Sequence, residues 1–209
     1  GAHIYIYDVI FPEFGADAKG LMAAVASIGR VADLGVHINS PGGDVFEARA
    51  MGAILRATGA NITVYIDGLA ASAASELALN LGGRVVMAKG SFLMIHNAST
   101  MVWGNKEEMR KTADVLEKID ASIAGVYALK TGLETEPVAA LMAAETWLSS
   151  DESLAGKWVD AVEGNTVTNK FDLSVYSSAP KQLEPVKDSA PVFDQRAHNE
   201  RRARLALAA

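Results

Sequence analysis

Short β-type segments alternate with helical segments along most of this 209-residue chain. Apolar runs typical of buried strands are followed by stretches whose apolar residues recur every three or four positions. The predicted strands cover residues 4–10, 35–39, 62–66, 85–87 and 92–95, and the predicted helices cover 18–28, 45–58, 72–81, 106–130 and 137–144. Strands that alternate with helices usually pair in parallel through right-handed crossovers. The order therefore predicts an α/β fold with a largely parallel central sheet.

The composition narrows the classes of function. Half of the residues are hydrophobic and 21% are charged, as in a globular domain. A formal net charge of −6 argues against a nucleic-acid partner. The absence of cysteine excludes disulfides, thiolate metal sites and a cysteine nucleophile. No apolar run reaches about 18 residues, so no membrane span is predicted, and no phosphate, dinucleotide or zinc motif points to a cofactor or metal.

A change of composition near residue 168 predicts a domain boundary. Residues 1–167 are expected to form the main domain. Residues 168–209 form a polar tail interrupted by prolines. Within that tail, residues 196–207 fit a basic amphipathic helix, and a solvated tail is the alternative.

Ser72 lies among very small residues, directly after the β-branched run 62–66. A strand there would deliver Ser72 to a turn lined by glycine and alanine, and this turn would open a helix near Ala73. Small neighbours let another backbone approach the hydroxyl, and a helix N-terminus favours developing negative charge. This environment suits a nucleophile that attacks a carbonyl, although a tightly packed strand-to-helix corner is the better explanation of the segment taken alone. Ser75 is the alternative nucleophile, and we expect it to be less exposed.

Acyl transfer by serine also needs a base, an orienting acid and donors for the oxyanion. His96 follows the predicted strand 92–95, so it shares with Ser72 the sheet edge where the carboxyl ends of parallel strands meet. The turn containing Gly42 and Gly43 also ends a strand at this edge, and its N–H groups could form an oxyanion hole. The remaining histidines lie in predicted strands or in the tail: His3, His37 and His198.

Three ordered blocks of sequence resemble the signature of the ClpP peptidases. They cover residues 38–43, 68–72 and 94–96, and their separations also fit that family. The resemblance extends from about residue 4 to residue 163. Further details, including Glu145-Thr146-Trp147, resemble the phage and prophage branch, whose members are commonly linked to head maturation.

The resemblance implies roles for individual residues. Ser72 would be the nucleophile and His96 the general base, with the backbone N–H groups of Gly43 and Ala73 as the oxyanion hole. The family carries an Asp just before its Phe/Trp-Leu-Ser block, and this chain has Glu145 there. Asp151 is the runner-up for the acid, although it resembles a helix-capping residue. Three residues are expected to contact substrate: Gly42, Leu69 and Asn97.

The resemblance also implies an architecture and partners. We expect the ClpP/crotonase-like superhelical fold of repeated β-β-α units, with the helix 106–130 as a protruding handle. Such chains assemble into homo-oligomeric rings, as heptamers or stacked heptamers. A strand from residues 98–104 would bind an extended peptide by β-augmentation. The segment that contacts an unfoldase in this family is short or missing here, which argues against an ATP-driven partner.

These observations lead to one hypothesis and three rivals. The hypothesis is a serine endopeptidase, cytoplasmic or associated with the prohead, that processes phage scaffold and capsid proteins. One rival is a degradative ClpP-type subunit working with an AAA+ unfoldase. Another is an enoyl-CoA hydratase-like enzyme, which would need carboxylates beside the oxyanion hole and would not need Ser72. The third is a non-enzymatic assembly or scaffold protein that binds through the 168–209 tail.

Overall fold

The computed structural model describes residues 1–165, 171–180 and 183. In this part of the chain the strands are β1 (Ala2–Ile6), β2 (Asp33–Ser40), β3 (Asn61–Ala71), β4 (Arg84–Lys89), β5 (Phe92–Ile95), β6 (Thr146–Ser149) and β7 (Ala161–Asn165). The helices are α1 (Ala18–Ile28), α2 (Val45–Ala57), α3 (Ala73–Leu79), α4 (Lys106–Thr131), α5 (Thr135–Ala143) and α6 (Ser150–Ala155). The predicted alternation of strands and helices is therefore confirmed.

A parallel sheet forms the centre of the molecule, with strand order β1-β2-β3-β4-β7. Strand β3 is long enough to pair twice on the same side. Its residues 63–66 pair with β4, and its residues 69–71 pair in parallel with β5. Strand β6 then runs antiparallel to β5. This mixed sheet confirms the predicted α/β class and places the ends of β3 and β5 side by side.

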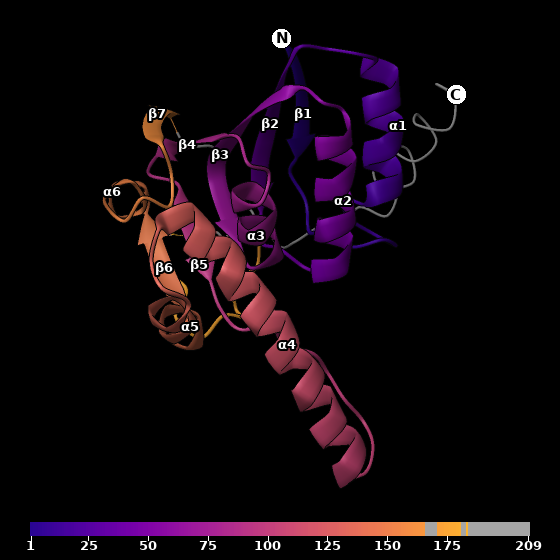
Figure 1. Ribbon diagram of the computed structural model, residues 1–209, viewed down its shortest axis with the longest axis vertical. Coiled ribbons are helices and arrows are strands. Elements are labelled where there is room, and N and C mark those ends of the chain that lie inside the picture. Colours follow the sequence, from indigo (N-terminus) through magenta and orange to yellow (C-terminus); the bar gives the residue numbers. More distant parts are fainter. Residues whose placement is uncertain (166–170, 181–182, 184–209) are drawn as a thin grey trace, which may run out of the picture.

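One face of the sheet is covered by helices that share a single apolar core with it. Helices α1 to α5 contact one another in sequence order along this face. Helix α4 reaches far beyond the body, and its N-terminal end is the most distant point (Figure 1). A capping box between Asn105 and Glu108 starts α4, and Gly132 ends it in the left-handed conformation, with φ of 76°. These bounds match the predicted helix 106–130, and its projection fits a handle.

Within residues 1–165, 171–180 and 183, the other face of the sheet is covered where β3, β5 and β6 meet. Alternate residues of β3 point to this face, so Tyr65, Leu69 and Ala71 share it. Leu69 and Ala71 are fully buried in a second apolar cluster, to which Leu173 and Leu183 contribute. Part of the predicted tail therefore packs against the main domain. The predicted helix 196–207 lies outside the described residues.

Three local expectations differ from the structure. The first strand ends at Ile6, and Ile10 instead forms isolated bridges with Ala16 and Gly43. Strand β3 continues past residue 66 to Ala71, because its small residues pair with β5. Residues 98–104 form no strand. None of the described strands pairs with this loop.

Candidate active site

Ser72 follows β3 directly and is the N-cap residue of α3. Its φ of 55° and ψ of −125° are unusual for a residue with a side chain. The neighbouring strand holds this conformation, because the Ser72 N–H donates to the carbonyl of Met94 over 3.0 Å. Ala71 and Met94 are register partners in β3 and β5. The two strands therefore deliver Ser72 and His96 to the same point.

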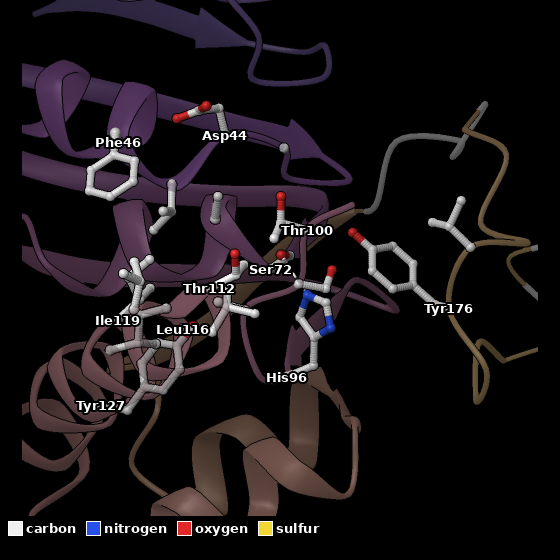
Figure 2. A pocket seen from close by; sticks show the side chains of 18 residues that line it. Asp44, Phe46, Ser72, His96, Thr100, Thr112, Leu116, Ile119, Tyr127 and Tyr176 are labelled. Carbon is white, nitrogen blue, oxygen red and sulfur yellow. Dashed lines mark hydrogen bonds between the residues drawn. The ribbon is translucent and has the colours of Figure 1, made fainter. Parts of the chain in front are cut away.

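His96 lies with its Nε2 atom 2.7 Å from the Oγ of Ser72 (Figure 2). Burial lowers the pKa of His96 below its ordinary value, and the negative charges of Glu145 and Asp120 oppose this change. The net effect favours the neutral imidazole at neutral pH. A neutral Nε2 can accept the Ser72 proton, which is the first requirement of a general base.

The Gly42–Gly43 turn lies against the nucleophile. Its φ angles of 91° and 142° require glycine. A Cβ on Gly42 would lie 2.5 Å from the carbonyl oxygen of Ala71 and 2.8 Å from Cβ of Ser72. Ile10 fixes the turn, because its N–H donates to the Gly42 carbonyl and its own carbonyl accepts from the Asp44 N–H, each over 2.8 Å.

The two expected oxyanion donors have no acceptor in the described part of the chain. Within residues 1–165, 171–180 and 183, neither the Gly43 N–H nor the Ala73 N–H donates a hydrogen bond. Ala73 is the first residue of α3, where a backbone N–H has no partner inside the helix. Both groups are thus available to an oxygen bound beside Ser72.

Ser75 is fully buried, as expected from its place inside the helix. Its Oγ donates to the Ser72 carbonyl over 2.6 Å and lies 2.7 Å from the hydroxyl of Tyr127. Since Ser75 has one proton and donates it to Ser72, Tyr127 is the donor in the second bond. Ser75 therefore supports the turn that carries Ser72.

Glu145 does not contact His96 through a hydrogen bond in the part of the chain that is described. Its carboxylate instead accepts from the Ser178 N–H at 2.6 Å, from the Ser177 N–H and Oγ at 2.9 Å each, and from Trp147 Nε1 at 3.2 Å. Desolvation raises the pKa of Glu145, but these donors outweigh it and hold the pKa below its ordinary value. The carboxylate is therefore ionised and lies near His96. It is held by the C-terminal segment, which is residues 171–180.

Asp151 lies in the first turn of α6, where it is exposed. The N-cap of this helix is Ser149, which forms a capping box with Glu152. The residue that caps α6 is therefore two positions earlier than the sequence predicts. No hydrogen bond joins Asp151 to His96 among the described residues.

Tyr176 is the residue at this site that the sequence did not reveal. Its hydroxyl donates to the carbonyl of Pro41 over 2.5 Å, and its ring packs edge-on against His96 with centroids 5.4 Å apart. In Figure 2 Tyr176 enters from the side opposite to α4, with its hydroxyl directed toward Ser72. Nothing in the polar stretch around it signals such a contact, because the surface it meets is formed only in the folded sheet.

The family of the chain follows from comparison with known proteins. The model of the Clp protease family matches residues 3–166. The chain belongs to the Clp protease family. This assignment agrees with the mixed α/β architecture and with the position of the three sequence blocks around Ser72 and His96.

Several named members of the Clp protease family are similar to this chain. It is 25% identical over 150 residues to the ATP-dependent Clp protease proteolytic subunit 3 of Rhodococcus jostii (strain RHA1), covering 71% of this chain and 72% of that one. It is 28% identical over 157 residues to the proteolytic subunit of Hordeum vulgare, covering 73% and 72%. For the subunit of Streptococcus equi subsp. equi (strain 4047), the identity is 27% over 145 residues, covering 64% and 69%.

A cavity of about 450 Å³ opens beside Ser72 in this Clp-family chain. Helix α4 forms one wall with Leu116, Ile119 and Ile123, and α2 contributes Val45 and Phe46 (Figure 2). The cavity is therefore largely apolar on the side facing α4. The residues expected to contact substrate do not line it: Gly42 is buried under Ser72, Leu69 lies beneath the C-terminal segment, and Asn97 is exposed on the surface.

The described lining of the cavity offers few further groups that could take part in catalysis. Among the described residues that line the cavity, Asp44 is the only carboxylate, and it accepts from the Glu47 N–H over 2.8 Å as the N-cap of α2. A hydratase-like site would need carboxylates free to move a proton, which this position does not offer.

No group of three or more metal-ligating side chains is found in the described regions. Nor does any helix there have the length and apolarity to cross a bilayer.

Proposed function

We propose that this Clp-family chain is a serine endopeptidase that works through an acyl-enzyme. The observation that carries the proposal is the 2.7 Å contact between Ser72 Oγ and His96 Nε2. A nucleophile and base at this distance lie beside two backbone N–H groups that donate to none of the described residues, which meets the geometric requirements of acyl transfer. The neutral state of His96 supports its role as proton acceptor.

The reaction proceeds in two stages. Ser72 Oγ attacks the peptide carbonyl while His96 Nε2 takes the hydroxyl proton, and the N–H groups of Gly43 and Ala73 donate to the oxyanion. The C–N bond then breaks as His96 gives its proton to the leaving amine, which leaves an ester on Ser72. Water attacks this ester with His96 again as base, releasing the carboxylic acid and restoring Ser72. Glu145 would orient the imidazole once it is released from Ser177 and Ser178.

We assign its natural substrates to the scaffold and capsid proteins of a phage prohead. The Glu-Thr-Trp block at Glu145 and its resemblance to the phage branch support this setting. The names of the curated relatives, which are subunits of ATP-dependent Clp proteases, favour the second candidate, a degradative subunit that needs an AAA+ unfoldase. In either setting we propose a homo-oligomeric ring. Met101 and Trp103, fully exposed beside the handle, support contacts between copies.

Co-expression separates the two settings. The full chain is expressed with a phage major capsid precursor, alone or with an AAA+ unfoldase, and the precursor is followed by gel electrophoresis and mass spectrometry. Processing by the chain alone, and its loss in His96→Ala, supports head maturation. Cleavage only in the presence of the unfoldase supports the degradative role. If the precursor and unstructured peptides such as casein stay intact under all conditions, the endopeptidase proposal is wrong.

A further inference from the structure

A stretch of the C-terminal segment, residues 171–179, packs on an apolar surface of the sheet beside the nucleophile. This surface is formed by Leu69, Ala71, Phe92, Met94 and Trp147. Leu173 is buried in this cluster, and Phe171, Tyr176 and Ala179 pack against it. These contacts cover the outer face of β3 up to the residue before Ser72.

We propose that this apolar surface is a peptide-binding subsite of the protease and that residues 171–179 occupy it in cis, so that the chain restrains its own active site. The inference rests on the proposed peptidase function. It adds to that function a ligand class, namely a peptide with an aromatic residue followed by two backbone N–H donors.

Tyr176 shows where the aromatic residue of such a peptide would bind. Its side chain is largely buried, and its ring packs edge-on against both His96 and Trp147, with centroid distances of 5.4 and 5.8 Å. Its hydroxyl donates to the Pro41 carbonyl, one residue before the oxyanion turn. A substrate that reached Ser72 from this side would meet the Tyr176 ring first.

Glu145 gives the polar position. It accepts the backbone N–H groups of both Ser177 and Ser178 as well as the Ser177 hydroxyl. Backbone N–H groups occur in almost any peptide, so the carboxylate can hold a second chain in the same way after the cis segment leaves. Its engagement has a second consequence: while it binds the segment, no carboxylate hydrogen-bonds to His96 within the described chain. Docking therefore covers the Tyr176 side of the active site and withholds the acid expected to orient the base.

Labelling of Ser72 by a fluorophosphonate measures this restraint in the full chain. Tyr176→Ala removes the ring from His96 and is expected to raise the labelling rate about tenfold, the gain when a site open one-tenth of the time becomes open throughout. Ser178→Pro removes the shortest donor to Glu145 and is expected to act in the same direction. Tyr5→Ala, which truncates an exposed tyrosine on β1, is the matched control and leaves the rate unchanged.

A peptide with the sequence of residues 171–180 supplies the second arm. Added to Tyr176→Ala, it should slow labelling again, whereas the same peptide with alanine in place of its tyrosine should not. If both variants label at the wild-type rate or more slowly, the restraint is wrong, while labelling of Ser72 itself still upholds the peptidase. If no variant and no wild-type chain is labelled, the peptidase proposal fails and this inference fails with it.

Discussion

The hydroxyl of Tyr127 donates a hydrogen bond to Ser75 Oγ over 2.7 Å, and Ser75 donates its own proton to the Ser72 carbonyl. This chain of two bonds connects the handle helix α4 to the turn that carries the nucleophile. Tyr127 is buried and packs against Trp158, which fixes the position of its ring. Burial also raises the pKa of Tyr127, so its hydroxyl stays protonated and keeps the proton that it donates.

Replacement of Tyr127 by phenylalanine keeps the ring and removes this donor. We expect the free energy of unfolding to fall by about 1 kcal/mol, the usual net worth of one intramolecular hydrogen bond. Urea unfolding followed by circular dichroism measures the change. Tyr65→Phe is the control, because the Tyr65 hydroxyl makes no hydrogen bond within the described residues. Equal stability of the two variants would contradict the role of Tyr127 as a donor.

Gly42→Ala tests how closely the oxyanion turn packs on the nucleophile. The new Cβ would meet backbone at 2.5 Å and Ser72 at 2.8 Å, so either the turn or Ser72 must move. We expect peptide hydrolysis to fall by at least about a hundredfold, the loss that follows removal of one oxyanion donor.

Gly59→Ala is the matched control for Gly42→Ala. Gly59 also has a positive φ, of 68°, but nothing lies within 4 Å of the added carbon. Backbone strain alone should cost about 1–2 kcal/mol of stability there and leave the rate per folded molecule unchanged. A similar loss of activity in both variants would show that backbone strain, and not contact with Ser72, causes the loss of hydrolysis in Gly42→Ala.

The pH dependence of acylation follows from His96. Because burial lowers the pKa of His96, the neutral and catalytically competent form dominates at a lower pH than for an exposed histidine. The rate should therefore rise with pH and have its midpoint below about pH 6.5, the ordinary histidine value. A stopped assay with an uncharged ester substrate, run across the acidic and neutral range, measures the profile. A midpoint above the ordinary histidine value would contradict the lowering of the His96 pKa by burial.

Asp120 provides a way to move this midpoint. Its negative charge raises the pKa of His96, and its Oδ1 accepts the Ala98 N–H over 2.6 Å. Asp120→Asn keeps an acceptor oxygen and removes the charge, so the midpoint should move to lower pH. Asp114→Asn, on the same helix but absent from the interactions of His96, should leave the midpoint in place.

The sequence predicted the order of elements because each strand and helix carries its own local pattern. It also predicted that Ser72 and His96 lie at the same sheet edge, because both follow strands whose carboxyl ends meet there in a parallel sheet. The burial of Ser75 followed in the same way from its position one turn into α3.

The sequence did not predict contacts with surfaces that form only in the folded sheet. The partners of Glu145 are Ser177 and Ser178, more than thirty positions away in a stretch that reads as a polar tail. Ser177 and Ser178 reach Glu145 because their segment packs on the apolar surface around Leu69 and Trp147, which three strands form together. The strand expected at residues 98–104 is absent for a related reason: a strand needs a neighbour, and local sequence does not supply one.

The role of Ser72 as the nucleophile is tested most directly by active-site labelling. The full chain is incubated with a fluorophosphonate, digested, and mapped by tandem mass spectrometry, with Ser72→Ala and Ser75→Ala in parallel. We predict a single adduct on the Ser72 Oγ, its complete loss in Ser72→Ala and its retention in Ser75→Ala. An adduct that persists in Ser72→Ala, or one that maps to Ser75 in the wild-type chain, would contradict this role.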